Sequence, residues 1–526
     1  HIHDLEAYGQ TYNCLQMDVL RGFPYERFGR YSQHRKITAI LDHFRDLVVK
    51  LGNEQSGGIG FPNFDLDLEA IFDRLGLENS PENLAVLRDS IEAFMDWVNQ
   101  ARDRCGQTTY YVSLNLGLAT GAVGRFVTRT VIEYFRDSSL DLIKPNIVFK
   151  VKRGVNHLPT DPNQDLLQLA MESTCKKMIP TYLLFDSAPN ATYDPTKVAI
   201  MGCRTKVVAN VNGENRSVGR GNIDYVTINL PRIALEIDAA HPEWSPEAKL
   251  QRFREEWDRT AEVVKDILID RYRRLLALTA DDFPCNQTYK LWLEDLVQGR
   301  SLDEVFRHGT MSVGFIGLSE AVEVMTGEKY FRSDRASRMA LDIAQHMRQS
   351  VDDYKRLLNL NFTLLASSGE YISGRFPAID AKRFEHPVAG KGFYTNSFHV
   401  DVDSDLDPVQ KIEMEGPFHS YANGGCISYV EFSSALLDNT EAVAEVIQAG
   451  VENGVNYLGI NFPLDHCLDC GEQGTFDLCP RCGGGHIHRI RRVSGYLEDL
   501  EFFTAGKKAE VSCRRPNAIA PPERGC

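Results

Sequence analysis

The sequence has no apolar run that approaches the roughly 18–20 residues that a membrane-spanning helix needs. Its first ten residues, HIHDLEAYGQ, have neither the basic nor the apolar region of a secretory signal peptide. We therefore expect a cytoplasmic protein with no membrane partner. The chain also begins without Met, so we expect it to be a processed or partial chain.

Basic residues are fewer than acidic residues. The chain has 58 Lys and Arg residues against 73 Asp and Glu residues, which gives a net charge of −15 at pH 7. Proteins that coat nucleic acids need a basic surface to displace counterions, so we expect no nucleic-acid polymer as partner. Twelve cysteines without a secretion signal indicate reduced thiols, metal ligands or redox chemistry rather than a disulfide framework.

The pattern of apolar residues alternates between short β-rich segments and longer amphipathic ones, which predicts an α/β fold. The final residues, 513–526, contain nothing that would anchor a core, so we expect a disordered tail. A strand, a glycine turn and a helix are predicted over 311–327. The other predicted strands include 108–117, 146–154, 181–187, 223–230 and 361–368, and the predicted helices include 126–138, 165–178, 246–278 and 337–358.

Four cysteines near the C-terminus form two closely spaced pairs, Cys467-Leu-Asp-Cys470 and Cys479-Pro-Arg-Cys482. Each CxxC turn places two thiolates on one side of an ion, and two such turns suit tetrahedral Zn²⁺. Neighbouring glycines fit the tight turns that let backbone approach the sulfurs. Four sulfurs leave no open position on the ion, so the predicted zinc is structural.

A distinctive segment follows this cysteine cluster, with Arg491-Arg492-Val493-Ser494-Gly495-Tyr496-Leu497 in sequence. A four-cysteine site followed by these residues resembles the glycyl-radical segment of the class III (anaerobic) ribonucleotide reductases, a family of glycyl radical enzymes. The resemblance implies that Gly495 carries a stored radical. Glycine suits this task, because a Cα radical without a Cβ can flatten and delocalise onto both flanking peptide groups.

Segments over nearly the whole chain carry the same resemblance. Met201-Gly202-Cys203-Arg204-Thr205 resembles the family's finger loop, which makes Cys203 the thiyl-radical residue. HIHDLEAYGQTYNCLQ resembles the opening active-site stretch and places Cys14 as the second functional cysteine. By its position after the finger loop, Asn222 is the candidate for a polar contact to formate. Residues 366–370, ASSGE, depart from the Thr-Pro-Ala-Glu of the family.

The resemblance also implies a fold and a division of the chain. We expect a ten-stranded α/β barrel over residues 1–460 with the finger loop near 203. A zinc-ribbon-like and glycyl-radical segment is expected over 461–512. The ATP-cone domain that usually precedes the barrel in this family is expected to be absent from this chain.

The implied activity is the anaerobic reduction of ribonucleoside triphosphates to deoxyribonucleoside triphosphates for DNA precursor synthesis. The implied partners are nucleotide substrates and allosteric nucleotide effectors, a second copy of the chain in a homodimer, and a separate iron–sulfur activase. That activase uses S-adenosylmethionine to make the radical, and we find no cysteine triplet here that would build such a cluster within the chain. The electrons come from formate or from a redoxin, and the sequence leaves both open.

Two other functions are compatible with parts of the sequence. A carbon–carbon lyase of the pyruvate formate-lyase type would also use a glycyl radical, but the zinc site beside Gly495 and the finger-loop motif argue against it. A non-enzymatic zinc-ribbon protein could bind nucleic acid through His488, Arg489, Arg491 and Arg492. That function would leave the acidic body of the chain unexplained.

Overall fold

Two groups of parallel strands build the central sheet of the protein. The computed structural model describes residues 2–3, 11–102, 109–138 and 142–517. The opening stretch 4–10 and the tail 518–526, for which the sequence makes predictions, lie outside these residues. So does the start of the strand predicted from 108. Within the described ranges, no helix is long and apolar enough to cross a membrane.

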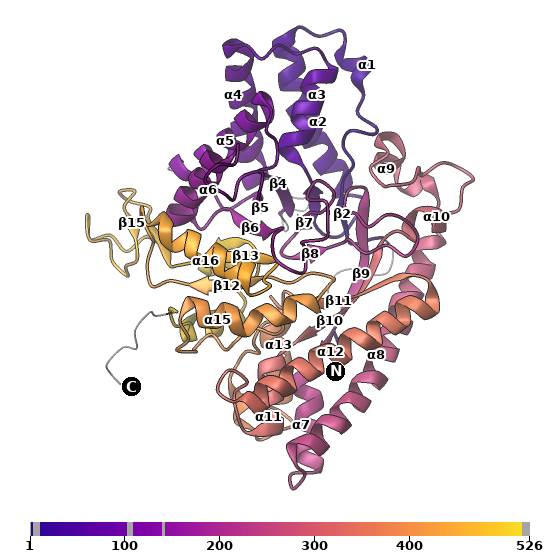
Figure 1. Cartoon of the computed structure of the whole chain (residues 1–526), viewed down its shortest axis with the longest axis vertical. Helices are drawn as coiled ribbons and strands as arrows, with labels where there is room; N and C mark the ends of the chain where they lie inside the picture. The colour runs from indigo at the N-terminus through magenta and orange to yellow at the C-terminus, as the bar shows by residue number, and fades with distance from the viewer. Residues whose placement is uncertain (1, 4–10, 103–108, 139–141, 518–526) are drawn as a thin grey trace.

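The first group of strands comes from the first third of the chain and is covered by helices on its outer side (Figure 1). All five strands are parallel, because one or more helices between each strand and the next return the chain to the same end of the sheet. The strands are β2 (Cys14–Gln16), β3 (Ile59–Phe61), β4 (Val112–Leu116), β5 (Asn146–Val151) and β6 (Thr181–Leu184). The helices are α1 (Tyr25–Phe28), α2 (Gln33–Leu51), α3 (Phe64–Arg74), α4 (Pro81–Gln100), α5 (Ala122–Asp137) and α6 (Gln164–Lys177).

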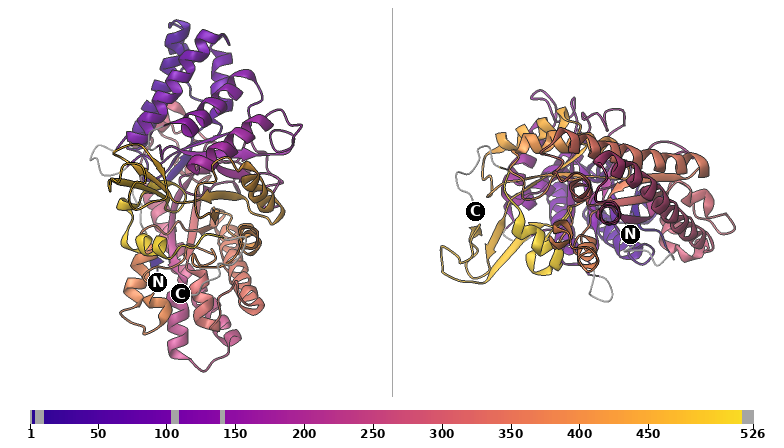
Figure 2. Two further views of the ribbon diagram at one scale, coloured as in Figure 1. Left: turned by 90° about the vertical axis from the view of Figure 1, so that its left-hand side faces the viewer. Right: turned by 90° about the horizontal axis from the view of Figure 1, so that it is seen from below.

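The second group of strands forms the rest of the barrel, and its two longest helices lie toward the opposite end of the molecule from the helices of the first group (Figures 1 and 2). The strands are β9 (Arg220–Asn229), β10 (Thr310–Ile316), β11 (Asn361–Ala366), β12 (Ser428–Glu431) and β13 (Tyr457–Asn461). The helices are α7 (Leu230–Ala240), α8 (Pro246–Leu276), α9 (Pro284–Tyr289), α10 (Asp303–Phe306), α11 (Leu318–Thr326), α12 (Asp334–Leu358), α13 (Ile372–Asp380), α14 (Pro387–Gly390), α15 (Pro408–Glu415) and α16 (Thr440–Glu452).

The two groups join into the ten-stranded barrel that was expected. β2 pairs antiparallel with β9, and β6 pairs antiparallel with β13. Between β11 and β12 the ring is completed by a parallel bridge between Leu365 and Gly425. The Gly424 N–H donates to Leu364 O at 2.8 Å, and the Ala366 N–H donates to Gly425 O at 3.0 Å. Every residue of β4, β6, β10, β11 and β13 is buried, because helices cover the outer face and other chain segments fill the interior.

Two hairpins approach this interior. One lies between β6 and β9 and consists of β7 (Ile200–Met201) and β8 (Thr205–Lys206). The other belongs to a separate antiparallel sheet in the order β15-β14-β16-β17, part of which lies at the edge of the molecule (Figure 1). Its strands are β14 (Leu464–Cys467), β15 (Gln473–Gly474), β16 (Ile487–Arg492) and β17 (Leu497–Asp499).

The last helix of the described residues, α17 (Ala505–Cys513), includes residue 513, where the disordered tail was expected to begin. Residues 514–517 are fixed by hydrogen bonds to the barrel. The Arg515 N–H donates to Val402 O at 2.8 Å, and Asn517 and Glu431 exchange hydrogen bonds in both directions. The structure therefore differs from the predicted tail over 513–517, because the side chain and backbone of Asn517 pair with the end of β12.

Candidate active site

The tips of the two hairpins meet at Gly495 and Cys203. Gly495 lies in the turn between β16 and β17, and Cys203 lies in the turn between β7 and β8. A Cβ built on Gly495 would lie 2.5 Å from Cys203 Cα and 2.6 Å from Cys203 Cβ. Real Cβ atoms do not approach other atoms so closely, so only glycine fits at position 495. The sequence predicted both residues as functional, and the structure brings them into contact.

Polar side chains of the barrel hold the finger loop inside it. The Asn115 side chain on β4 donates to Ile200 O and accepts from Ile200 N, both at 2.9 Å. Asn146 on β5 donates to Gly202 O at 3.1 Å. Gly202 has φ +57°, a conformation that favours glycine and turns the chain sharply before Cys203. These contacts fix the backbone that leads into the cysteine.

A carboxylate connects the two hairpin tips. The Cys203 thiol donates to Glu370 Oε1 at 3.3 Å, and the Ser494 hydroxyl donates to the same oxygen at 2.6 Å. The Tyr496 hydroxyl donates to Glu370 Oε2 at 2.8 Å. Sequence reasoning did not identify Glu370 as functional, because its segment departs from the family pattern. The signal available in the sequence was Glu370, because the family pattern also ends in Glu shortly before the Ser-Gly-Arg-Phe segment.

Burial raises the pKa of Cys203 well above its usual value, and the nearby Glu370 carboxylate raises it further. The sulfur is therefore a thiol rather than a thiolate at neutral pH. A thiol carries the hydrogen atom that a radical relay must pass on, whereas a thiolate has none to give.

A cavity of about 190 Å³ opens beside Cys203 and has room for a sugar-sized group. Cys14 lines the same cavity, so the structure brings together the two cysteines that were predicted to be functional. The Cys14 thiol donates to Asn13 Oδ1 at 2.7 Å, and the Gly58 N–H donates to Cys14 Sγ at 3.1 Å. The other lining residues are Asn13, Ser56, Gly57, Gly58, Tyr111, Gly202, Arg204, Thr205, Tyr225, Leu365, Ser368, Glu370, Tyr371 and Tyr496.

Asn222, the candidate for a polar contact to formate, lies on β9. It is not among the described residues that line the cavity. Its side-chain amide donates at 3.0 Å to Thr310 O, Thr310 Oγ1 and Ser312 Oγ, and these contacts tie β9 to β10. Only its backbone pairs with Cys14 across the β2–β9 junction. Its role toward formate stays a prediction.

The four C-terminal cysteines converge as the sequence predicted. Their sulfurs all lie within 4.8 Å of one another, and the two closest pairs are Cys470–Cys479 at 3.4 Å and Cys467–Cys482 at 3.6 Å. Zn–S bonds of about 2.3 Å in a tetrahedron place sulfurs about 3.8 Å apart, so the donor set fits zinc. Gly471 and Gly483, with φ +78° and +71°, form the turn after each pair.

Comparison with known proteins matches residues 1–516 to the family described as anaerobic ribonucleoside-triphosphate reductase. The chain is 31% identical to the Escherichia coli K12 anaerobic ribonucleoside-triphosphate reductase, over 98% of this chain and 76% of that protein. It is 27% identical to the phage T4 enzyme, over 98% of this chain and 89% of that one.

The fold agrees with these sequence matches. The structure of the Thermotoga maritima anaerobic ribonucleotide reductase in complex with dATP and CTP superimposes with a TM-score of 0.68 at 14% identity, over 96% of this chain and 82% of that one. These similarities support neither the lyase nor the nucleic-acid-binding alternative. The chain belongs to the anaerobic ribonucleoside-triphosphate reductase family.

Proposed function

We propose that the two hairpin tips carry the radical chemistry of ribonucleoside-triphosphate reduction, with Gly495 storing the radical and Cys203 acting on the substrate. The observation that supports this most directly is the contact between Gly495 and Cys203, which leaves no space for any side chain at 495. Hydrogen-atom transfer needs such an approach, because the donor and acceptor atoms must nearly touch.

The relay begins when the Gly495 Cα radical takes the hydrogen atom of the Cys203 thiol. The S–H bond is comparable in strength to the C–H bonds on either side, so the transfer is reversible. The resulting thiyl radical takes the 3′-hydrogen of a ribonucleotide bound in the adjacent cavity. The 2′-hydroxyl then leaves as water after it is protonated, and the thiol later returns the hydrogen atom to C3′.

Glu370 is the group best placed to move protons during these steps. Its carboxylate contacts the Cys203 thiol and lines the substrate cavity. The hydroxyls of Ser494 and Tyr496 hold both of its oxygens. We assign it the role of general acid–base toward the sugar hydroxyls, which requires hydrogen-bond reach to the reacting group.

The net reaction adds two electrons and two protons to the ribonucleotide and releases one water. Cys14 lies on the wall of the same cavity and is proposed to pass on reducing equivalents. Oxidation of formate to carbon dioxide supplies two electrons and one proton, and a dithiol redoxin supplies two electrons and two protons. Both reductants stay open, as does the predicted assistance of Asn222 to formate.

Zinc held by Cys467, Cys470, Cys479 and Cys482 would be structural, because four sulfurs complete its tetrahedron. Cys467 ends β14, and β14 pairs with β16, the strand that leads into the Gly495 turn. The metal-binding residues therefore stabilise the strand that presents the glycine to the finger loop.

Nucleotide substrates and effectors are supported by the Thermotoga maritima relative, whose structure contains dATP and CTP. We extend the proposal to a homodimer and to a separate activase that uses S-adenosylmethionine to generate the radical. Both follow from the family resemblance.

The test is anaerobic electron paramagnetic resonance (EPR) of the chain after incubation with an activase, S-adenosylmethionine and a reductant, followed by CTP turnover. We expect a doublet signal and dCTP formation in the parent and neither in Gly495→Ala. Gly390→Ala is the matched control, because a Cβ at position 390 meets nothing within 4 Å. A parent without the doublet, treated with an activase that is competent on another family member, would contradict the proposal.

A further inference from the structure

Two buried arginines bind the backbone carbonyls on either side of Gly495. Arg492 Nη1 donates to Gly495 O at 3.1 Å, and this oxygen belongs to the peptide group that follows the glycine. Arg204 Nη2 donates to Ser494 O, in the peptide group that precedes it. Only 1% of Arg204 and 2% of Arg492 is exposed to solvent.

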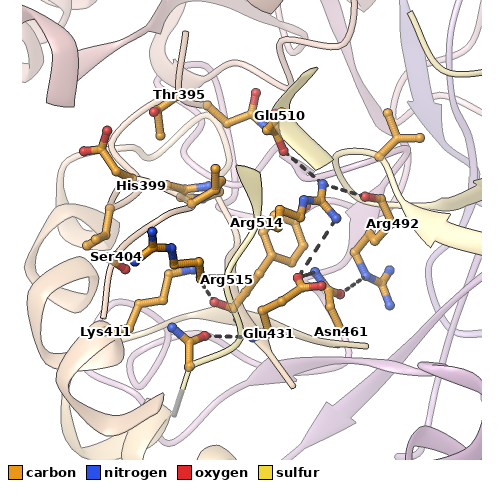
Figure 3. A pocket seen from close by; sticks show the side chains of 17 residues that line it. Thr395, His399, Ser404, Lys411, Glu431, Asn461, Arg492, Glu510, Arg514 and Arg515 are labelled. Atoms are coloured by element: carbon orange, nitrogen blue, oxygen red, sulfur yellow. Dashed lines mark hydrogen bonds and ion pairs between the residues drawn. The ribbon is translucent and has the colours of Figure 1, made fainter. Parts of the chain in front are cut away.

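Neither guanidinium forms a direct ion pair with a carboxylate in the part of the chain that the structure describes, although burial lowers the pKa of Arg492 and the nearby Glu431 partly offsets this. Among the described residues, no carboxylate oxygen lies within 4.0 Å of a nitrogen of either arginine. Arg492 instead donates to Asn461 Oδ1 at 2.7 Å and to Met178 O at 2.5 Å, and Figure 3 shows it directed toward Asn461. Arg204 Nη2 also donates to the Tyr429 hydroxyl at 3.3 Å.

A buried cation without a direct ion pair is costly, so hydrogen-bonding dipoles must offset much of that cost. Here the compensating dipoles include the two carbonyls that flank the glycine. The fold therefore concentrates two positive charges on one short backbone segment. Packing alone does not require this, since apolar side chains of similar volume would fill both sites.

We propose that Arg204 and Arg492 are positioning residues that set the electronic structure of the Gly495 radical through its two flanking carbonyls. This inference rests on the proposed function, because it concerns the radical state of Gly495. The two hydrogen bonds hold both peptide groups in one orientation, and a Cα radical delocalises onto them only when they are coplanar with it.

The two arginines act on opposite sides of the radical. A glycyl radical is stabilised by electron donation from its nitrogen and by electron withdrawal into its own carbonyl oxygen. The Arg492 guanidinium favours negative charge on Gly495 O and thus increases this delocalisation. The Arg204 guanidinium draws the nitrogen lone pair toward Ser494 O and opposes it. The balance between them determines how readily the radical moves to sulfur.

The position of Arg204 in the chain strengthens this inference. It directly follows Cys203, and its Nη1 atom is 3.5 Å from Ala366 O and Ser367 O at the end of β11. The same side chain therefore fixes the thiol-bearing turn, the end of a barrel strand and the peptide group of the radical glycine. Arg492 is fixed in turn by the Arg514 guanidinium, which donates to Arg492 O at 2.9 Å (Figure 3).

The experiment is electron–nuclear double resonance (ENDOR) on the activated full chain, produced with arginine that carries ¹⁵N in its guanidinium. Arg204→Lys and Arg492→Lys are compared with the parent, since lysine keeps the charge but lacks the planar fork. Arg220→Lys is the matched control. Arg220 is also fully buried and binds backbone carbonyls, at Val208, Ala209, Arg216 and His308.

We expect ¹⁵N couplings from two guanidinium groups in the parent. Each of Arg204→Lys and Arg492→Lys should lose one of them, and Arg220→Lys should keep both. In Arg492→Lys the doublet should also widen, because spin density returns to the Gly495 Cα. A parent that holds the radical but shows no ¹⁵N coupling would overturn the inference, even if a variant fails to fold. A parent without any radical would instead refute the proposed function.

Discussion

At the scale of single residues, Glu370 connects the turn that carries Gly495 to the cavity beside Cys203. Its two oxygens accept hydrogen bonds from the thiol that is proposed to react and from the residues on both sides of Gly495. Because the carboxylate raises the pKa of Cys203, it also helps to keep the thiol protonated. In the proposed function, this side chain therefore acts in both the proton transfer and the hydrogen-atom transfer.

Glu370→Gln should separate these two kinds of chemistry. The amide can still accept a hydrogen bond from Ser494 or Tyr496, so we expect the glycyl radical to form at the level of the parent. Proton transfer is lost, so dCTP formation should fall by roughly 10²–10⁴-fold. EPR and product analysis on the same sample measure both quantities. Glu385→Gln, at an exposed position, is the control, and turnover at the parent rate in Glu370→Gln would refute the assigned role.

At the scale of secondary-structure elements, the cysteine cluster and the turn that carries Gly495 belong to one small sheet. β16 runs from beside the cluster to Arg492, and its pairing with β14 and β17 sets the direction of the turn. The barrel strands belong to a different sheet. The cysteine cluster is therefore joined to the Gly495 turn through this small sheet, without being part of the barrel core.

Removing one zinc ligand should therefore abolish the radical but spare the barrel. We expect Cys479→Ser to lose zinc and the EPR doublet while its far-UV circular dichroism and thermal midpoint stay near those of the parent. Cys513→Ser is the control, because Cys513 is an exposed cysteine outside the cluster. Metal analysis, EPR and circular dichroism on the two variants test this. A zinc-free Cys479→Ser that still forms the parent amount of radical would contradict the expectation.

α17 and α13 pack closely where Gly506 of one contacts Gly374 of the other. A Cβ on Gly506 of α17 would lie 2.3 Å from Gly374 Cα of α13. The same region joins α17 to Glu370, whose carbonyl accepts a hydrogen bond from Thr504 Oγ1 at 3.0 Å. The close approach of the two backbones therefore places the start of α17 beside the segment that contains Glu370.

Gly506→Ala should destabilise this contact despite the better helix propensity of alanine. Alanine gains about 0.5–1 kcal/mol in a helix interior, whereas overpacking against backbone costs about 1–3 kcal/mol. We expect a lower thermal midpoint and a lower radical yield than in the parent. Gly390→Ala, which meets open space, serves as the control in the same melting and EPR measurements. Equal midpoints in both variants would show that α17 adapts freely.

The long elements of this fold are those that the sequence predicts well. α8, α12 and β10 follow from apolar spacing, because each is long enough to show its period. β2 and β3 have three residues each, which is too short for any period to appear. β2 nevertheless carries Cys14 and joins the two halves of the barrel by pairing with β9, and β3 pairs with β2 from the other side.

The candidate site also contains some residues that local sequence patterns predict and others that they do not. The cysteine pairs predict their own cluster, because their spacing is local and carries the geometry of the metal. Gly495 and Cys203 are far apart in the sequence, and only the family resemblance related them. Glu370, Arg204 and Arg492 act through contacts between distant segments. No local pattern encodes such contacts, so their roles become visible only in the folded chain.

At the scale of the whole molecule, both halves of the barrel bury a neutral histidine. His43 on α2 lies among aromatic rings, including Phe23 at 5.3 Å and Tyr289 at 5.0 Å. His419 lies in the second half and contacts Asn456 and Ser428. Burial lowers the pKa of each histidine to about 4. Protonation of either one therefore opposes folding.

The sign of the resulting pH dependence follows from proton binding. Between about pH 6.5 and pH 4 the unfolded chain holds more protons on these histidines than the folded chain, so the free energy of unfolding falls as the pH is lowered. Lowering the pKa from 6.5 to about 4 corresponds to about 3 kcal/mol for each histidine. This stability is present above pH 6.5 and is lost by about pH 4.

His43→Leu tests this pH dependence, because leucine fits an apolar site and cannot be protonated. We expect the loss of stability between pH 7 and pH 5 to be smaller in this variant than in the parent, as measured by urea unfolding at several pH values. His34→Leu is the control, since His34 lies exposed on the same helix and should leave the slope unchanged. If His43→Leu and the parent lose stability equally over this range, His43 does not contribute to acid unfolding.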